Sequence, residues 1–216
     1  MAYGESAFDI IYLALAVFCG IRVLLKAQNR TEKYMGLAVL ILGLGDAFHL
    51  IPRVLNYFTD SDLTPALGTG KLVTSLTMTV FYVMMYRIYV GHYGVKENGG
   101  LSAAVYALTV LRFVLCALAQ NNWLQNESSV TWGIIRNLPF VALGTIIVAL
   151  YFKKRNETGR FRFIWLYVAL SFIFYIPVAV AAGLLPILGM LMLPKTVCYI
   201  LIILTFYNHV VREKKA

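Results

Sequence analysis

Charged residues are scarce in this chain of 216 residues, since only 13% are charged while 60% are hydrophobic. A soluble domain has about a quarter of its residues charged and about half apolar. So few charges exclude an ordinary soluble globular protein and indicate that lipid is the solvent. Seven apolar runs with short connections occupy the sequence and leave no room for a separate soluble domain.

Cysteine and histidine are scarce as well, with three of each. The cysteines all fall inside apolar segments, at Cys19, Cys116 and Cys198. An odd set of this kind predicts neither a disulfide framework nor a metal site. A zinc centre needs about three ligands close together. His92 and His209 are predicted near one membrane face and His49 in the opposite half of the membrane, so no second histidine reaches His49. We therefore expect no metal and no cofactor.

Acidic residues are half as frequent as basic ones, which gives a formal net charge of +9. In a soluble protein this charge would suggest nucleic acid as a partner. Here the basic residues gather in alternate loops, near positions 26–33, 96, 153–162 and 212–215, while the loops at 60–65 and 121–129 have no Lys or Arg. This asymmetry predicts a topology instead, because basic loops stay in the cytoplasm. We expect a multi-pass protein of the cell membrane and no nucleic acid.

The fold class predicted from these runs is an all-α integral membrane protein, because backbone polar groups in lipid must be paired within the helix. It is a seven-transmembrane-helix bundle with its N-terminus outside and its C-terminus cytoplasmic. We expect a single domain over residues 1–216. Its helices are predicted at about 8–26, 34–57, 68–92, 101–119, 131–152, 162–183 and 190–210.

A short set of polar residues falls inside the predicted spans, where ionisable groups cost at least about 2.5–3.5 kcal/mol each at the helix centre. The set comprises Asp46, His49, Arg53, Lys71, Arg112, Arg136, Asn137 and Lys195. Counting at about 1.5 Å per residue places all of them in the outer half of the membrane. At that cost, each of them must face a partner, a cavity or the interface.

The segment Gly45–Arg53 is the most informative part of this set. At about 100° per residue, Asp46, His49 and Arg53 fall within about 60° on one helix face. They form a polar stripe from the middle of the membrane to its outer surface, which is not expected to face lipid.

Two readings of these residues stay open. Asp46 and Arg112 are placed to form a structural ion pair, and the shallower cations are able to extend to the outer headgroups. Alternatively, five cations facing a single intramembrane carboxylate would give a cavity with excess positive charge, which favours a phosphate or carboxylate group. Aromatic residues would then suit the cavity wall to an amphiphile, namely Phe48, Tyr82, Trp132, Phe140, Tyr175 and Tyr199.

The candidate ligand-binding residues are accordingly Arg53, Lys71, Arg112, Arg136, Asn137, Tyr175 and Lys195. If the protein is an enzyme, Asp46 and His49 are the candidate catalytic residues. They lie one turn apart on one helix, so one can donate a proton while the other activates water.

The stretches LILGLGDAFHLIP and ALGTGKLVTSLTMTVFYVMMY resemble a pattern of the lysoplasmalogenase-like membrane family, over about residues 38–86. The resemblance implies a multispanning lipid hydrolase that cleaves the vinyl-ether bond of lysoplasmalogens. Only Asp46 carries over by motif. The second acidic residue of that family is replaced by Phe172, its histidine on the following helix by Thr77 or Thr79, and its usual helix count of eight by seven.

Three functions remain in competition. The favoured one is a binding or sensing protein, receptor-like, for an anionic amphiphile or a small organic anion held in an outer-half polar cavity. The alternatives are a membrane lipid hydrolase of lysoplasmalogenase type that uses Asp46, and a small-molecule transporter. Against transport, we see no inverted repeats and no paired broken helices. The expected partners are membrane lipids and the anionic or amphiphilic ligand, and the oligomeric state is not predicted.

Overall fold

A computed structural model of the chain describes residues 2–126, 129–181 and 185–212. Within this part of the chain the structure consists of helices and their connections. The α-helices are α1 (Ala2–Lys26), α2 (Arg30–Asn56), α3 (Thr64–Tyr93), α4 (Gly99–Ala117), α5 (Val130–Lys153), α6 (Ile164–Ala181) and α7 (Met192–Tyr207). Four short 3-10 segments and a π-turn complete it, at Ala119–Asn121, Trp123–Gln125, Arg160–Phe163, Pro186–Leu191 and Asn208–Arg212.

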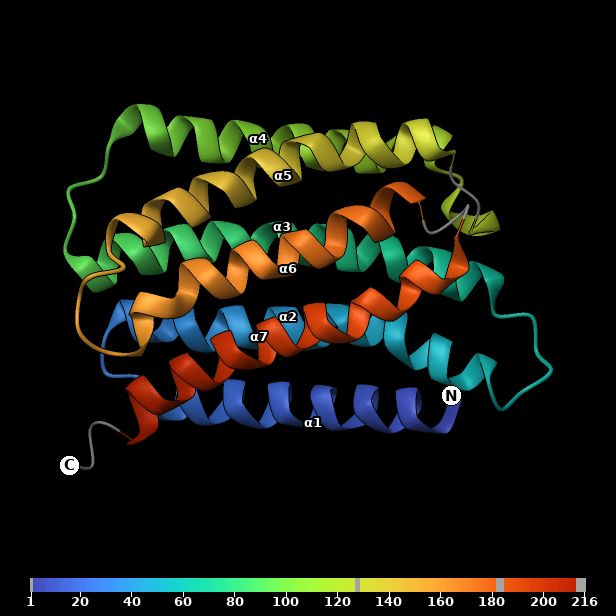
Figure 1. The fold of residues 1–216 in the computed structure, drawn as a ribbon, viewed down its shortest axis with the longest axis horizontal. Helices are drawn as coiled ribbons and strands as arrows, with labels where there is room; N and C mark the ends of the chain where they lie inside the picture. Colours follow the sequence, from blue (N-terminus) through green and yellow to red (C-terminus); the bar gives the residue numbers. More distant parts are fainter. Residues whose placement is uncertain (1, 127–128, 182–184, 213–216) are drawn as a thin grey trace.

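The seven α-helices lie side by side along one common direction (Figure 1). Each helix contacts the next one along the chain, and α7 returns to contact α1, so the helices form a closed ring. α3 also contacts α5 across the ring. The N-terminal end of α1 lies at one end of the bundle and the C-terminal end of α7 at the other (Figure 1). We call these the N-end and the C-end.

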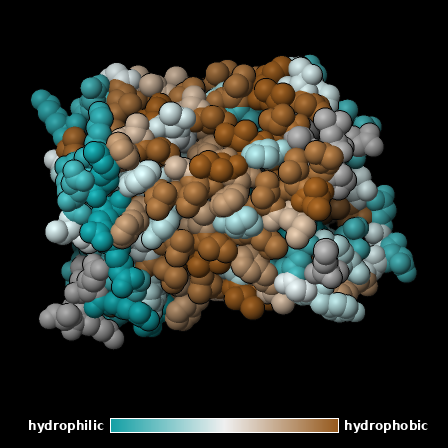
Figure 2. All heavy atoms as spheres, in the orientation of Figure 1, coloured by the Kyte–Doolittle hydropathy of each residue, from teal (hydrophilic) through white to brown (hydrophobic). Residues whose placement is uncertain are grey.

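Seven helices of the described chain are long and apolar enough to cross a membrane, with lengths between 19 and 30 residues. About 20 apolar residues are needed to span the hydrocarbon core. Hydrophobic residues cover the middle of the bundle, and hydrophilic residues gather most densely at the C-end (Figure 2). The prediction of an all-helical protein with seven such segments is confirmed, and the chain is a multi-pass membrane protein by this criterion.

The helix limits differ from the predicted ones most at the start of the chain. α1 begins at Ala2 instead of at about residue 8, so Glu5 and Asp9 belong to the first turns of a helix. The carboxylate of Glu5, in the first turn, is favourable there because it interacts with the positive end of the helix dipole. The predicted sixth helix ends at residue 183, and its last two residues lie outside the described chain.

Local sequence signals account for several helix ends. Asn29 caps α2 by accepting a hydrogen bond from the backbone N–H of Glu32 at 3.0 Å, and Glu32 accepts one in return from the N–H of Gln28 at 2.7 Å. Ser129 caps α5 in the same way through the N–H of Trp132. α3 ends at Tyr93 and is capped by Gly94, whose left-handed conformation (φ 58°) is one that glycine adopts without strain. These caps satisfy backbone groups that a helix end leaves unpaired.

A proline inside α2 shapes the wall that α2 shares with α3. Pro52 has no N–H, so the carbonyl of Phe48 loses its partner within the helix. α3 packs against this point through Gly70, because a Cβ added there would lie only 2.2 Å from the Phe48 carbonyl oxygen. The α2–α3 contact is the most extensive between any two helices of the described chain. A glycine at position 70 is therefore required for the two helices to approach this closely.

Replacing Gly70 with alanine is expected to lower stability by about 1–3 kcal/mol, because a methyl group forced against backbone must push the helices apart. The apparent melting temperature of the purified protein in detergent should fall by several degrees. Gly4→Ala is the matched control, because nothing lies within 4 Å of a Cβ added at this other helical glycine. A Gly70→Ala protein as stable as the Gly4→Ala protein would contradict this account of the α2–α3 contact.

Candidate functional site

A cavity of about 520 Å³ lies inside the N-end half of the bundle, and all seven α-helices contribute to its wall. All nine residues that the sequence analysis singled out as catalytic or ligand-binding line this cavity. They are Asp46, His49, Arg53, Lys71, Arg112, Arg136, Asn137, Tyr175 and Lys195. The structure therefore brings the predicted residues together from α2, α3, α4, α5, α6 and α7. Their roles toward a ligand stay a prediction.

The α2 stripe lies on the cavity wall, with Asp46 nearest the middle of the bundle. The Tyr12 hydroxyl of α1 donates a hydrogen bond of 2.7 Å to Asp46 Oδ2. The predicted ion pair between Asp46 and Arg112 does not form, because no carboxylate lies within 4 Å of the Arg112 guanidinium in the described chain. Asp46 thus receives a hydrogen bond from a neutral donor, and it also interacts electrostatically with Lys195 of α7.

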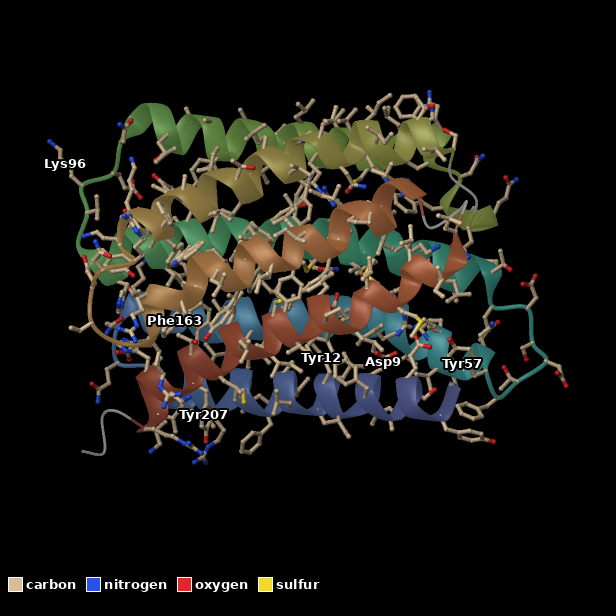
Figure 3. All side chains as sticks on the ribbon, viewed as in Figure 1. Asp9, Tyr12, Tyr57, Lys96, Phe163 and Tyr207 are labelled. Atoms are coloured by element: carbon tan, nitrogen blue, oxygen red, sulfur yellow. The ribbon has the colours of Figure 1, made fainter. Side chains whose placement is uncertain are left out.

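Arg53, at the outer end of the stripe, is neutralised by carboxylates of α1. Its Nη2 lies 2.6 Å from Asp9 Oδ2 and 3.1 Å from Glu5 Oε1. The Tyr57 hydroxyl donates a 2.9 Å hydrogen bond to Glu5 Oε2, and partial burial together with this carboxylate raises the pKa of Tyr57. Tyr12, Asp9 and Tyr57 succeed one another toward the N-end (Figure 3). Arg53 therefore contributes no surplus charge to the cavity.

Arg112 of α4 is the most deeply buried cation, with only 2% of its surface exposed. Its Nη1 donates to Asn137 Oδ1 at 3.1 Å and to the Arg136 carbonyl at 3.4 Å. Its Cζ lies 3.9 Å from the centre of the Phe140 ring, and its Nε is buried without a hydrogen-bond partner. Asn137 Oδ1 also accepts a 2.7 Å hydrogen bond from Tyr175. The groups that contact the Arg112 guanidinium are thus neutral dipoles and an aromatic ring face.

Arg136 of α5 is held by the connection between α4 and α5. Its Nη1 donates to Asn121 Oδ1 at 2.9 Å, and its Cζ lies 4.4 Å from the Trp123 ring centre. Asn121 in turn donates to the carbonyls of Leu115 and Leu118, and Trp123 Nε1 donates to a carbonyl of the same turn. These contacts fix a short connection that carries no helical periodicity in its sequence. Sequence reasoning therefore missed Trp123 as part of the cavity wall.

The two lysines of the cavity have no carboxylate within 4 Å in the described chain. Lys195 Nζ lies 4.9 Å from the Tyr175 ring centre and 5.5 Å from that of Tyr199. Lys71 is exposed on α3 at the cavity rim. Of five lining cations, four have no carboxylate of the described chain within 4 Å, namely Lys71, Arg112, Arg136 and Lys195. The lining carboxylates are Asp9 and Asp46, and Asp46 interacts with Lys195 at longer range.

Asp9 is the second carboxylate of the cavity, and the sequence analysis did not count it among the buried groups. It is 3% exposed because the early start of α1 places it on the inner side of a helix. The signal was present in the chain, since Asp9 and Tyr12 are three residues apart and so share a helix face. The surplus of positive charge is accordingly smaller by one than the sequence predicted.

The aromatic wall also differs from the expected one. Phe140 and Tyr175 line the cavity, but Phe48 is 60% exposed on the outside of α2. Tyr82 and Tyr199 belong to the packed core, where their hydroxyls lie 3.4 Å apart. The predicted wall of six aromatic residues is therefore wrong in part. Aliphatic side chains complete the apolar lining, namely Leu50, Met78, Val130, Val178, Val180, Met192 and Leu193.

His49 is the remaining titratable group of the wall, and its Nδ1 is buried without a hydrogen-bond partner. No group of three or more His, Cys, Asp or Glu side chains in the described chain is arranged to hold a metal ion. His49 therefore lines the cavity with one ring nitrogen that has no hydrogen-bond partner in the described chain.

Comparisons of the chain with protein-family models, with curated proteins and with solved structures found no match. The resemblance to the lysoplasmalogenase-like membrane family therefore stays a prediction.

Replacing Arg53 with methionine is expected to destabilise the protein by about 3 kcal/mol, because it leaves the buried Asp9 carboxylate without its partner. The apparent melting temperature in detergent should fall by about 6–12 °C. Adding Asp9→Asn to Arg53→Met should recover part of this loss. Lys71→Met is the matched control, since it removes a lining cation that has no carboxylate partner and relieves repulsion. If Lys71→Met destabilised the protein as much as Arg53→Met, the assignment of Arg53 as the neutralised cation would be wrong.

Proposed function

We propose that this chain is a cell-membrane protein that binds an anionic amphiphile or a small organic anion in the cavity of its N-end half, as a binding or sensing protein. The observation that carries the proposal is Arg112. An ionised side chain this deeply buried is costly unless it is paired, and here its protein partners are neutral. A carboxylate or phosphate group in the cavity would supply the missing countercharge.

The other cations support the same class of ligand. Arg136 and Lys195 are held over aromatic rings, and neither is within 4 Å of a described carboxylate. A guanidinium presents a planar fork of donors that matches a phosphate or carboxylate, while an ammonium acts as a compact point charge. The aromatic contacts already hold the Arg136 and Lys195 side chains in position, so binding an anion costs little additional side-chain entropy.

Size and lining extend the proposal to an amphiphile. The volume of about 520 Å³ falls within the range of about 300–1,000 Å³ typical of small-molecule sites. Charged groups of α4, α5 and α7 lie together with apolar side chains of the same wall, such as Met78, Phe140 and Val178. A molecule with an acidic group and a short apolar part would contact both the charged groups and the apolar side chains favourably.

The N-end is proposed to face the outside. Basic residues concentrate at the C-end, in the connections that follow α1, α3 and α5, whereas the connection 57–63 at the N-end has no Lys or Arg. Basic connections stay in the cytoplasm. The cavity would then receive its ligand from the outer leaflet or from the external medium.

The orientation predicts a labelling asymmetry in intact cells. Ser61→Cys at the N-end should react with a membrane-impermeant maleimide, and Lys96→Cys at the C-end should react only after the cells are lysed. The three native cysteines are buried, so they give little background. Labelling of Lys96→Cys but not of Ser61→Cys in intact cells would invert the proposed topology.

Binding is tested by thermal shift of the purified protein in a non-ionic detergent. Dodecyl phosphate should raise the melting temperature in a concentration-dependent way, because a ligand that binds only the folded state stabilises it. Dodecyl trimethylammonium, with the same tail and the opposite charge, should not. Lys195→Gln should weaken the dodecyl phosphate effect by about tenfold in concentration, as expected for the loss of one charge-assisted contact.

The matched control is Lys96→Gln, which removes the same charge from an exposed position at the C-end. It should leave the dodecyl phosphate response unchanged. An equal response of the wild type to both probes, or an equal loss in both variants, would refute an anion site in the cavity. Native mass spectrometry of the freshly purified protein then identifies any anion or lipid that it retains.

Hydrolysis of a lipid in the same cavity is the second candidate, and one observation favours it. The buried Nδ1 of His49 has no hydrogen-bond partner, and His49 shares the cavity wall with Asp46. An imidazole and a carboxylate at one wall can divide proton donation and water activation. Release of an aldehyde from a lysoplasmalogen by the wild type, abolished in Asp46→Asn, would decide for hydrolysis, and its absence would leave binding alone.

A further inference from the structure

A second hollow lies at the opposite end of the bundle from the cavity. It has a volume of about 350 Å³ and lies where α5 ends and α6 begins. Its lining residues are Arg155, Asn156, Arg162, Phe163, Trp165 and Leu166. Phe163 marks this place at the C-end of the bundle (Figure 3). The hollow combines two guanidinium groups with an indole ring and an aliphatic side chain, so its lining is both cationic and apolar.

Arg155 is held in position by an aromatic pair. Its Nη1 donates a 3.1 Å hydrogen bond to the Phe152 carbonyl, and its Cζ lies 4.1 Å from the centre of the Phe152 ring. The Phe152 ring packs edge-on against Trp165, with centroids 4.9 Å apart and an interplanar angle of 83°. The guanidinium therefore rests on a ring that is itself fixed by the lining of the hollow, which limits the rotamer freedom that a ligand would otherwise have to remove.

Arg162 reaches the same hollow from the 3-10 segment that precedes α6. Its Cζ lies 4.5 Å from the Phe163 ring centre. Neither Arg155 nor Arg162 has a carboxylate within 4 Å in the described chain, whereas the neighbouring Lys154 is paired with Glu157 at 2.7 Å. The nearby Glu157 is thus paired with Lys154, and the positive charges of Arg155 and Arg162 have no carboxylate partner in the described chain. Two uncompensated guanidiniums match a phosphate group, which they can bind through several parallel N–H donors.

The position of the hollow selects the source of that phosphate. It lies where the hydrophobic middle of the bundle gives way to the hydrophilic C-end (Figure 2). In a membrane this boundary is the level of the lipid headgroups, where tryptophan is enriched and basic pockets between helices attract anionic lipids. Phe163 is 39% exposed and Trp165 lies beside it, so an acyl chain leaving the hollow would meet apolar side chains.

We propose that this hollow binds the headgroup of an anionic glycerophospholipid. The phosphate lies between the guanidiniums of Arg155 and Arg162, the Asn156 amide serves the polar headgroup, and Trp165 packs beside the start of the acyl chains. The site is separate from the cavity of the N-end half, and it does not depend on what that cavity binds.

The test is native mass spectrometry of the purified protein, titrated with dioleoyl phosphatidylglycerol or with dioleoyl phosphatidylcholine. The wild type should retain one phosphatidylglycerol at a lower concentration than phosphatidylcholine. Arg155→Gln combined with Arg162→Gln should raise the phosphatidylglycerol concentration for half-occupancy by about thirtyfold, since two basic groups near an anionic headgroup are lost. Arg155→Lys combined with Arg162→Lys keeps the charge but not the planar donors, and it should show an intermediate effect.

Two further arms separate this site from its alternatives. Lys33→Gln combined with Lys96→Gln removes the same number of exposed charges from the C-end and should leave half-occupancy within about threefold of the wild type. Lys195→Gln, in the cavity, should not affect it. An equal loss in the Lys33/Lys96 variant would reduce the effect to general surface charge, and an equal loss in Lys195→Gln would place the lipid in the cavity. Displacement of the lipid by millimolar inorganic phosphate would show a free-phosphate site. Each of these three results, or an unchanged Arg155/Arg162 variant, overturns the proposal.

Discussion

The burial of Arg112 without a carboxylate partner in the described chain is the constraint around which the cavity half of the bundle is arranged. Inside a low-dielectric bundle the charge needs polar contacts, and it obtains them from an amide oxygen, a main-chain carbonyl and an aromatic face. Asn137 presents that oxygen because its Nδ2 donates to the Gly133 carbonyl at 2.8 Å, which fixes the amide orientation. Tyr175 adds a donor to the same oxygen. Helices α4, α5 and α6 are thus joined by one cation and its neutral contacts.

The cations of the cavity fall into two groups that the protein treats differently. Arg53 is placed between two carboxylates of α1, so its charge is used to join α1 and α2. Arg112, Arg136 and Lys195 are each placed over an aromatic ring instead. A ring face attracts a cation without neutralising it, so the charge stays available to a third group. This separation of a structural ion pair from cations that have no described carboxylate within 4 Å distinguishes the cavity from a network of salt bridges.

The sequence predicted the helices and most of the polar residues of the cavity wall for the same reason. Ionisable groups in lipid are costly, so the few present had to face inward, and counting residues from the basic loops placed them at one depth. The sequence did not predict the partners, because these depend on how each helix is rotated about its axis. Tyr12 contacts Asp46 and Asp9 contacts Arg53 because α1 is rotated so that both of its side chains face α2. Likewise Trp123 joins the wall through a connection of short 3-10 turns, whose course no hydrophobic period reveals.

The close contact between α2 and α3 at Phe48 and Gly70 determines which part of the cavity wall is rigid. The Phe48 carbonyl, released by Pro52, meets α3 at Gly70 with no side chain between them, so these helices are in backbone contact beside the cavity. Backbone in contact with backbone leaves no flexible atoms to absorb a shift. The polar stripe of α2 and the face of α3 that packs against α2 therefore form a rigid half of the cavity wall. Under the proposed function, any adjustment of the cavity to the size of its ligand falls on the other half, where α6 contains Pro177 and a 3-10 segment leads into α7.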